Sequence, residues 1–395
     1  HGATAGNGGV VGAPGSGKRV NLRGQDFSFD PEERDLRAEN GGGQYGLCFD
    51  EWGRKFVCSN SNHIQAVIYP RRYAGEGLPH ARVAVAADGP AAEVFRLSPD
   101  EPWRIVRTRW RVAKLVGGPI EGGGRVSGYF TAATGIGIYR GQAFIADAGS
   151  NLIHRKILHY PGVQPVAERP PEEVGTEFLA STDNWFRPVQ LMPGPDGALY
   201  VADMYREVIE HPWSLPASIK KHLDLNSGND RGRIYRIVPD GGVLDRPDPP
   251  PAELAEIIAT EELGVLDESA RRRLSAMAEH PSAAVRFQLA LTLGLREGDW
   301  RYAPVVKVLV SAGDDRWLRA AALKALGTRS ALKFVTAVLD ADAQPSDSLL
   351  LELASYVRRS GDDDAGLLLT GYVREQSRPL RFQLAEGLGE GELAG

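Results

Sequence analysis

Three histidines end three similar segments of the chain. His63, His154 and His211 each follow the second of two short apolar stretches, in segments that begin near residues 44, 135 and 187. Near pH 7 a neutral imidazole can act as a general base or as a metal ligand. A single histidine is more often a packed or hydrogen-bonded residue, but three at matching positions predict a shared site.

Other polar residues surround the same positions. Asp147 and Asp203 come directly after an apolar stretch, where an aspartate often accepts backbone N–H bonds in the next turn. This structural interpretation stays open beside a functional one, and the asparagines nearby are also typical turn formers. The polar residues that end the second stretches are Ser59, Asn60, Asn62, Asp147, Asn151, Asp203, Arg206 and Glu210, and those that lead into the first stretches are Gln44, Tyr45, Thr134, Trp185 and Arg187.

Predicted β-hairpins would position these residues. Residues 44–63, 135–154 and 187–206 each hold an apolar strand, a turn containing glycine and a second apolar strand. In such a hairpin the start of the first strand and the end of the second strand lie at the same end. The long intervals between the hairpins leave room for four-stranded blades, which favours a β-propeller over a sandwich. The polar groups would then meet at one mouth of the central channel, where we expect a ligand.

The second half of the chain has a helical pattern. Residues 241–256 are rich in proline and read as a linker between a β half, residues 1–240, and an α half, residues 257–395. Arg-led apolar segments recur in the α half with a period of about 31–33 residues, which predicts stacked helix pairs that resemble HEAT repeats. The leucines expected in their core are Leu289, Leu293, Leu323, Leu326, Leu384 and Leu388.

The expected fold class is therefore multidomain β plus α: a partial β-propeller followed by an α-solenoid of HEAT-like repeats. The chain starts at His1 without the pattern of a signal peptide, and its last repeat reaches Gly395 without a polar capping helix. We expect a fragment that holds the C-terminal blades of the propeller, with the N-terminal blades and any targeting signal outside it.

Composition and charge exclude some classes of function. With 46 Lys and Arg against 51 Asp and Glu, the formal charge is −5, and no basic run would neutralise a phosphate backbone. We therefore expect no nucleic-acid partner. No window of about 18 apolar residues occurs, so we expect no transmembrane segment in these residues.

One motif resembles a nucleotide site but lacks its context. Gly12–Lys18 reads GAPGSGK, yet Arg19 stands where a Ser or Thr would hold magnesium. The residues that follow have a strand-like pattern, whereas a phosphate loop leads into a helix. We interpret this motif as a flexible loop before a strand.

The two cysteines suggest neither a disulfide scaffold nor a zinc site. A four-residue turn at Asp50–Gly53 would pair Phe49 with Arg54 and Cys48 with Lys55. Cys58 would then lie on the other face of the hairpin, which makes a disulfide awkward. A slip of one residue in the register would change these faces, and the cysteine count leaves the redox compartment open.

Four stretches together resemble a known family. They are Asn21–Pro31 (NLRGQDFSFDP), Tyr45–His63, Phe178–Pro212 and Asp230–Pro239 (DRGRIYRIVP). They resemble the membrane-bound dehydrogenase family of PVC-type haem-binding proteins, whose members look like a quinoprotein glucose or sorbosone dehydrogenase propeller followed by HEAT-like repeats and a cytochrome c domain. The resemblance covers most of the β half, and the α half by architecture only.

The resemblance implies an exported or periplasmic, membrane-associated enzyme that oxidises a sugar or an alcohol. Pyrroloquinoline quinone (PQQ) would accept hydride, and calcium would polarise the carbonyl oxygens of the quinone. Electrons would pass to haem c in a domain outside these residues, because no Cys-x-x-Cys-His signature occurs here.

The same resemblance implies roles for the residues of the predicted mouth. The base would be His63, His154 or His211, the charge clamp Arg206 or Arg187, and the metal ligands Asp147 or Asp203. The remaining candidates for cofactor binding are Asn60, Asn62, Asn151, Trp185 and Tyr205.

Two other functions remain open. The chain could be a binding or assembly module in which the propeller docks a glycan or a protein and the helical repeats offer a second surface for a protein partner. It could also be a calcium-dependent lactonase, with Asp and Asn around one metal and a histidine base.

Overall fold

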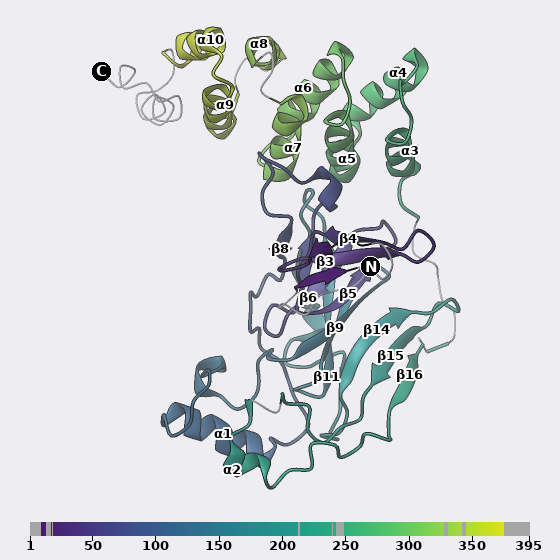
Figure 1. The fold of residues 1–395 in the computed structure, drawn as a ribbon, viewed down its shortest axis with the longest axis vertical. Helices are drawn as coiled ribbons and strands as arrows, with labels where there is room; N and C mark the ends of the chain where they lie inside the picture. Colours follow the sequence, from purple (N-terminus) through teal and green to yellow (C-terminus); the bar gives the residue numbers. More distant parts are fainter. Residues whose placement is uncertain are drawn as a thin grey trace. The chain divides into compact units, whose positions relative to one another are not determined.

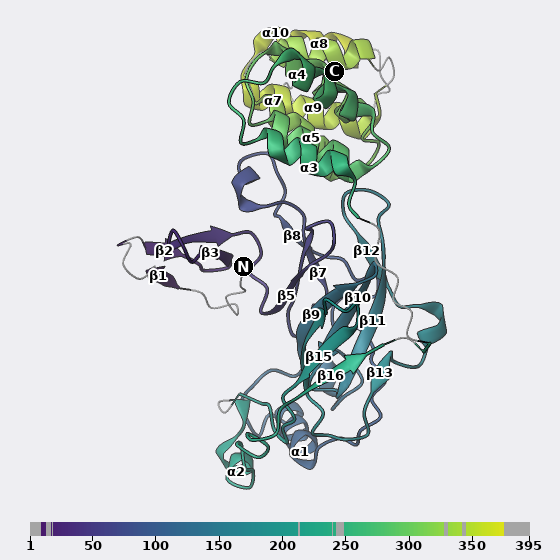
Figure 2. The same cartoon turned by 90° about the vertical axis from the view of Figure 1, so that its right-hand side faces the viewer.

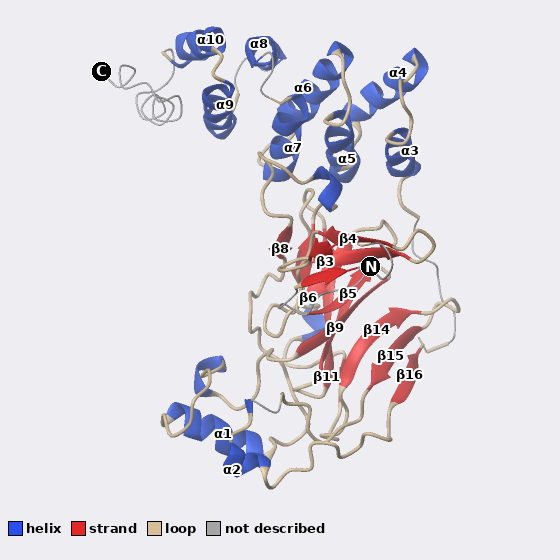
Figure 3. Ribbon diagram, viewed as in Figure 1, coloured by secondary structure: helices blue, strands red, loops and turns tan. Residues whose placement is uncertain are grey.

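The structure is a computed structural model of the chain and describes residues 9–12, 17, 19–211, 214–238, 240–241, 249–327, 331–341 and 345–374. The chain divides into two compact units. The first comprises residues 1–74 and 80–249, and the second comprises residues 75–79 and 250–395. Strands dominate the first unit and helices the second (Figure 3), which confirms the β-then-α organisation expected from the sequence.

The first predicted hairpin opens a four-stranded antiparallel meander. Its strands are β5 (Tyr45–Phe49), β6 (Lys55–Cys58), β7 (Gln65–Val67) and β8 (Arg82–Ala84), in that order across the sheet. Asp50 closes the β5–β6 turn by accepting the backbone N–H groups of Trp52 and Arg54 at 3.0 and 2.8 Å.

The register of this hairpin differs from the expected one by a single residue. Phe49 pairs with Lys55 and Cys48 with Phe56, with an irregularity between Tyr45 and Leu47. The expected pairing of Cys48 with Lys55 was therefore wrong, and Cys48 and Cys58 lie on the same face of the hairpin. The reason given against a disulfide therefore fails, and both cysteines are free in this structure.

The second hairpin also extends into a meander. Strands β9 (Ala133–Tyr139), β10 (Gln142–Asp147), β11 (Leu152–His159) and β12 (Val166–Glu168) follow one another across the sheet, and β13 (Leu179–Ala180) also pairs with β11. The two-residue turn Arg140-Gly141 has φ values of 54° and 69°. Positive φ at both central residues is the geometry that matches the twist of a tight hairpin.

The third hairpin belongs to a three-stranded meander. Its strands are β14 (Pro188–Pro193), β15 (Leu199–Asp203) and β16 (Arg233–Ile237). All three hairpins predicted from the sequence are thus confirmed, each as the first pair of its own sheet.

The three meanders pack through their first strands. Strand β9 contacts both β5 and β14 (Figure 1). A Cβ on Gly135 would lie only 2.4 Å from the carbonyl oxygen of Val189, so glycine is required for this close approach of backbones. One core cluster holds Phe56, Ile136 and Ile145, and a second holds Phe144, Leu191 and Val201, so β10 sends alternate side chains into two cores. The described residues form small antiparallel sheets and show no closed propeller.

Two short hairpins precede these sheets. Strand β1 (Val10–Gly12) pairs with β2 (Arg19–Asn21), and β3 (Asp26–Asp30) pairs with β4 (Asp35–Glu39). Most of the motif at Gly12–Lys18 lies outside the described residues, and the segment that follows it is the strand β2, as expected, and not a helix.

Helices are few in the first unit. They are α1 (Pro102–Val112) and α2 (Ala217–Lys220), which lie near each other in two views (Figures 1 and 2). Proline occupies the first turn of α1, where a missing N–H costs nothing. Short 3-10 helices also occur, namely η1 (Arg71–Tyr73), η2 (Gly122–Gly124) and η3 (Pro171–Glu173) in this unit and η5 (Met277–Glu279) and η6 (Asp299–Arg301) in the second.

The second unit consists of helix pairs, as the repeats predicted. The helices are α3 (Ala252–Thr260), α4 (Glu268–Ala276), α5 (Ala283–Leu293), α6 (Tyr302–Val310), α7 (Arg316–Leu326), α8 (Ala331–Ala341), α9 (Asp347–Ser360) and α10 (Asp363–Val373). Helix α5 packs between α3 and α7, and α6 packs against α8. Arg301 donates to the carbonyl oxygen of Ala325 at 2.8 Å, and Tyr356 donates to that of Gly327 at 2.7 Å. Neighbouring repeats thus satisfy carbonyl groups at helix ends.

The predicted leucine core is largely present. Leu289, Leu293 and Leu326 are buried, whereas Leu323 is only half-buried. Leu384 and Leu388 lie outside the described residues. Within the described ranges, no helix has the length and apolar character needed to cross a bilayer.

Candidate functional site

Helix α1 buries three of its four arginines and exposes both of its valines. Arg104, Arg107 and Arg111 are 4%, 5% and 7% exposed, while Val106 and Val112 are 36% and 50% exposed. Positions three and four residues apart share one face of a helix, so the three guanidinium groups point in one direction. This is the reverse of a normal amphipathic helix, and burial of charge is costly unless partners compensate for it.

The buried face of α1 borders a cavity of about 450 Å³. The opposite walls come from segments far apart in the chain: Gln44 and Asn60 of the first meander, Thr134 of the second, and residues 209–211 with Ser214 after the third. The Gly-rich stretch after α1 closes the remaining side with Ile120, Glu121 and Arg125. The cavity therefore lies where the ends of the three meanders face α1.

Each arginine on this face donates a hydrogen bond to a carbonyl oxygen or a carboxylate, but two of the three also have an N–H group without a partner in the described residues. Arg104 donates to the carbonyl oxygen of Gly149 at 2.8 Å. Arg107 forms an ion pair with Glu210 at 2.8 Å, and Arg111 donates to the carbonyl oxygen of Ser214 at 3.0 Å. The Nε groups of Arg107 and Arg111 are buried and have no hydrogen-bond partner among the described residues. The guanidinium groups of this face thus keep unsatisfied hydrogen-bonding capacity in a buried setting, which adds to the cost of their burial.

The charges that line the cavity do not balance. Four arginines, Arg104, Arg107, Arg111 and Arg125, face two glutamates, Glu121 and Glu210. In the part of the chain that the structure describes, no carboxylate lies within ion-pair distance of Arg111. Burial, and then the neighbouring Arg107, lowers the pKa of Arg111. Glu121 and Glu210 oppose these effects without reversing them, and an anion in the cavity would compensate the buried charge further.

Glu210 is the carboxylate nearest to this face. Ser214 Oγ donates to its Oε2 at 2.9 Å, on the same oxygen that pairs with Arg107. Burial would raise the pKa of Glu210, but Arg107 and Ser214 outweigh burial and hold this pKa below its usual value. Glu210 is therefore ionised near neutral pH.

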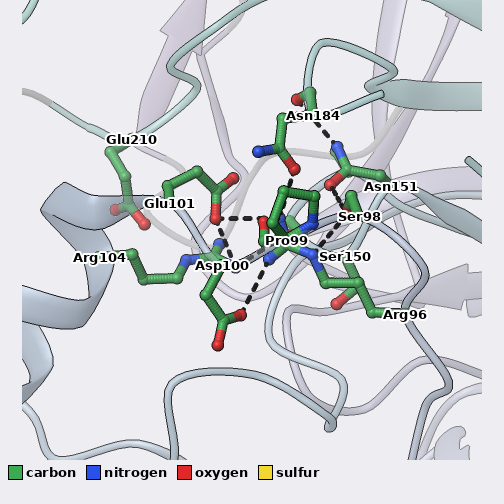
Figure 4. Close-up of polar contacts among 12 residues, drawn as sticks. Arg96, Ser98, Pro99, Asp100, Glu101, Arg104, Ser150, Asn151, Asn184 and Glu210 are labelled. Carbon is green, nitrogen blue, oxygen red and sulfur yellow. Dashed lines mark hydrogen bonds and ion pairs between the residues drawn. The ribbon is translucent and has the colours of Figure 1, made fainter. Parts of the chain in front are cut away.

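A second carboxylate anchors the start of α1. Glu101 is the N-cap residue of the helix and lies 3.0 Å from Arg187, 3.1 Å from Arg96 and 3.7 Å from Arg104. Figure 4 shows Arg96 enclosed by Glu101, Asp100 and Asn184. Burial would raise the pKa of Glu101, and the three arginines reverse this effect and lower it. This network fixes the position of α1 against the meanders.

The structure places some of the predicted site residues in the cavity wall. Asn60 and His211, which the sequence named as candidates for cofactor binding and catalysis, line the cavity, as do Gln44, Tyr45, Thr134 and Glu210 from the wider predicted mouth. The ends of the three hairpins are thus represented in one cavity.

His63 and His154 lie together elsewhere. Both are fully buried, their rings meet edge to face at 5.7 Å, and Phe130 stacks on His63 at 4.3 Å. His154 Nδ1 lies 2.6 Å from Glu177. Burial is the main cause of the lowered pKa values of both histidines: the pKa of His63 is about 3, and that of His154 is also well below its usual value. Both imidazoles are therefore neutral at pH 7. Neither residue lines the cavity.

Asp147 and Asp203 hold turns together. Asp147 Oδ1 accepts the N–H groups of Gly149 and Ser150 at 3.0 Å each, and Asp203 Oδ1 accepts those of Arg187 and Tyr205 at 2.8 Å each. Burial raises the pKa of Asp147 to about 6. These contacts match the structural interpretation that the sequence left open.

The other candidates also make structural contacts. Arg187 is 1% exposed and donates to the carbonyl oxygens of Arg206, Ala148 and Glu207, in addition to its ion pair with Glu101. Arg206 Nη1 donates to the carbonyl oxygen of Asn226, and the carbonyl oxygen of Asn62 accepts the N–H group of Ser59. The Asn151 side chain donates to the carbonyl oxygen of Phe186 and accepts from Ser98 Oγ. The rings of Trp185 and Tyr205 lie 5.6 Å apart.

Sequence reasoning missed the arginines of α1. The signal was present, because WRIVRTRWRV places arginines at helical spacing between valines. A helix of this kind is normally read with its apolar residues inward, which would have sent the arginines to solvent.

The described residues contain no group of three His, Cys, Asp or Glu side chains placed to hold a metal ion. The chain combines a β unit of packed antiparallel meanders, with an arginine-lined cavity, and a unit of helix pairs. Residues 1–241 match a family model described as a domain of unknown function, DUF7133, and the chain belongs to this family. Comparison with curated proteins and with solved structures finds no match.

Proposed function

We propose that the β unit binds a small organic anion, with carboxylate or phosphate groups, against the arginine face of α1. The observation that carries this proposal is Arg111, a buried guanidinium that lines the cavity and has no carboxylate within ion-pair distance in the described residues. Guanidinium groups bind carboxylates and phosphates through paired, charge-assisted hydrogen bonds.

The size and the lining of the cavity support a small-molecule ligand. A volume of about 450 Å³ is in the range of small-molecule sites. Besides the arginines, the wall offers the neutral polar side chains of Gln44, Asn60 and Thr134 and the apolar side chains of Ile120 and Val126. The ligand would therefore present its anionic groups to α1 and its remaining atoms to a mixed wall.

Calorimetric titration of the protein with citrate and with inorganic phosphate tests this proposal. We expect saturable binding that weakens by about tenfold or more in Arg111→Gln, because each lost charged hydrogen bond removes about 1.5–3 kcal/mol. Arg109→Gln is the matched control, since Arg109 is an exposed residue of the same helix and does not line the cavity. Equal affinities of the two variants, or no binding of either anion, would refute the proposal.

A narrower form of this proposal is that the anion is PQQ and that the protein is a dehydrogenase. The three packed meanders support their interpretation as propeller blades, and the arginines of α1 suit the three carboxylates of PQQ. When bound, PQQ supplies a quinone that accepts hydride from an alcohol. Of the three candidate bases only His211 lines the cavity, so it is our candidate for the group that takes the hydroxyl proton. The dehydrogenase proposal also includes export of the protein and transfer of electrons to a haem domain.

The expected calcium ligands fit this scheme poorly. Asp147 and Asp203 each use an oxygen on backbone N–H groups and neither lines the cavity, so we assign no calcium role to them. The lactonase alternative would rely on the same ligands and gains no support.

Titration with PQQ, with citrate as a competitor, tests the narrower form. Binding followed by the quinone absorbance should be saturable and displaced by citrate. Dye-linked oxidation of sugars and alcohols should fall by about a hundredfold in His211→Gln, which removes the base but leaves the arginines, in line with general-base contributions. If citrate binds and PQQ does not, the anion site stands and the dehydrogenase is refuted.

A further inference from the structure

Glu210 makes the contact that an anionic ligand would need. Its Oε2 lies 2.8 Å from Arg107 Nη1, so a carboxylate of the protein already occupies this donor. The Glu210 side chain is 21% exposed, against 6% for the Arg107 side chain, so solvent reaches the acid more readily than the base. Glu210 can therefore leave this contact for water, whereas Arg107 has no comparable exposure.

The segment that carries Glu210 also reaches the next arginine. Ile209, Glu210, His211 and Ser214 all line the cavity, and the Ser214 carbonyl accepts the bond from Arg111 at 3.0 Å. Ser214 Oγ in turn holds Glu210 at 2.9 Å. One segment of the chain thus contacts two of the three buried arginines.

We propose that Glu210 is a built-in counter-ion that competes with the ligand for Arg107, so that only an anion able to displace its carboxylate binds to both Arg107 and Arg111. This inference rests on the proposed anion site. It follows because a ligand oxygen can take the N–H group of Arg107 Nη1 that is directed at Glu210 only if it displaces Glu210 Oε2. An anion with a single weak charge gains too little to displace Glu210, whereas one that spans Arg107 and Arg111 replaces the lost contact and adds a second.

The cavity offers a matched carboxylate for comparison. Glu121 also lines the cavity, but it is exposed and forms no ion pair with an arginine within the described residues. Removal of its charge changes the potential of the cavity and leaves the contact with Arg107 intact. Glu121→Gln therefore measures the general effect of charge.

Titration of four variants with citrate at fixed ionic strength tests the inference. Glu210→Gln should bind citrate about tenfold more tightly than the unchanged protein, because the competing charged hydrogen bond is weakened. Glu210→Asp keeps the charge but shortens the side chain, and it should also bind citrate more tightly, by about threefold to tenfold. Ser214→Ala releases Glu210 without altering it and should give an increase of about twofold to threefold. Glu121→Gln should change the affinity by about twofold at most.

Acetate gives a second measurement of selectivity. In the unchanged protein citrate should bind far more tightly than acetate, and this ratio should fall in Glu210→Asp because the monoanion no longer has a competitor for Arg107. Melting curves of each variant check that the fold is retained. If both Glu210 variants fail to fold, the citrate affinity of Ser214→Ala still tests the inference.

The outcomes separate this inference from the proposed site. If citrate binds but Glu210→Asp and Ser214→Ala match the unchanged protein, or if Glu210→Gln and Glu121→Gln have equal effects, only general charge matters and the inference is refuted. If citrate and phosphate bind to none of the proteins, the proposed anion site fails, and the inference fails with it.

Discussion

Two buried polar regions of the β unit differ in how they tolerate burial. The histidine cluster consists of His63 and His154 with the acids Asp88 and Glu177, and the arginine face consists of Arg104, Arg107 and Arg111. A histidine can lose its proton on burial and become neutral, as the lowered pKa values of His63 and His154 indicate. An arginine stays charged, so its burial has to be compensated by carboxylates, carbonyl groups or a ligand.

This difference separates a structural cluster from a candidate site. The neutral imidazoles pack against Phe130 like other rings of the core and do not line the cavity beside α1. The arginines border a cavity and hold fixed charge that their protein partners do not balance. Fixed charge beside open space is a stronger indication of a binding site than titratable groups in a closed core.

The largest expected effect comes from Glu101→Gln. This change leaves Arg96, Arg104 and Arg187 buried around a neutral side chain, and removal of one partner of a buried ion pair typically costs about 3–5 kcal/mol. Chemical denaturation should show this loss in the free energy of unfolding. The exposed Glu121→Gln should change the stability by less than about 0.5 kcal/mol. A loss in Glu101→Gln as small as this would mean that Glu101 does not anchor the arginine face.

The next effect is a pH dependence in the histidine cluster. The pKa of His63 is about 3 in the folded state, against an ordinary value of 6.5 in the unfolded chain. Between these values the unfolded state binds more protons, so His63 removes stability as the pH falls from 6.5 towards 3, by about 1.4 kcal/mol for each pH unit.

Other charged groups face His63, so the measurement has to isolate its share. Asp88 and Lys156 lie beside it, and Glu177, whose pKa burial raises to about 7, opposes the trend because its folded form gains a proton first. The unfolding free energies of the unchanged protein and of His63→Gln should therefore be compared at pH 7.5 and 4.5. The loss on acidification should be smaller in the variant by about 2–3 kcal/mol. The exposed His159→Gln should keep the full loss, and equal losses in all three proteins would contradict a neutral buried His63.

A smaller effect of opposite sign is expected on the arginine face. Without a ligand, Arg111 adds a buried charge beside Arg107, so Arg111→Met should raise the free energy of unfolding by up to about 1 kcal/mol. The same variant should lose citrate binding. Arg107→Met should instead destabilise the protein, because it leaves Glu210 without its ion pair. A loss of more than about 1 kcal/mol in Arg111→Met would show that Arg111 serves the fold and not a ligand.

The sequence predicted the hairpins and helix pairs because their signals are local. Glycine turns between apolar strands and Arg-led apolar repeats depend on a few neighbouring residues. The register of β5 and β6 was missed by one residue because the connection between them holds five residues, Asp50–Arg54, and not four: Phe49 pairs with Lys55, and the Asp50 side chain accepts the N–H group of Arg54 inside the turn. The irregularity between Tyr45 and Leu47 was also not predicted. There a Cβ on Gly46 would lie 3.0 Å from the backbone nitrogen of Ile136 in β9, and such a contact between distant segments has no signature in the hairpin itself.

The site was predicted only in part for a similar reason. Asn60 and His211 follow from the hairpin geometry, and both lie in the cavity wall. His154 was also expected there, but it is the third residue of β11 and points into a core, because the pattern does not show where the next strand begins. The orientation of α1 could not be predicted, since it depends on carboxylates and carbonyl groups of Glu101, Gly149 and Glu210, far apart along the chain.

The smallest expected effect tests that orientation directly. If α1 turns its arginines inward, Val112 contributes little to the core, and Val112→Ala should change the free energy of unfolding by less than about 0.5 kcal/mol, with a small gain in helix propensity. The same substitution at the fully buried Val57 in β6 should cost about 2 kcal/mol, because it leaves a cavity in the core. Urea denaturation of both variants compares identical chemistry at the two positions. Equal losses would mean that Val112 faces a core, and the arginines of α1 would then face solvent and form no site.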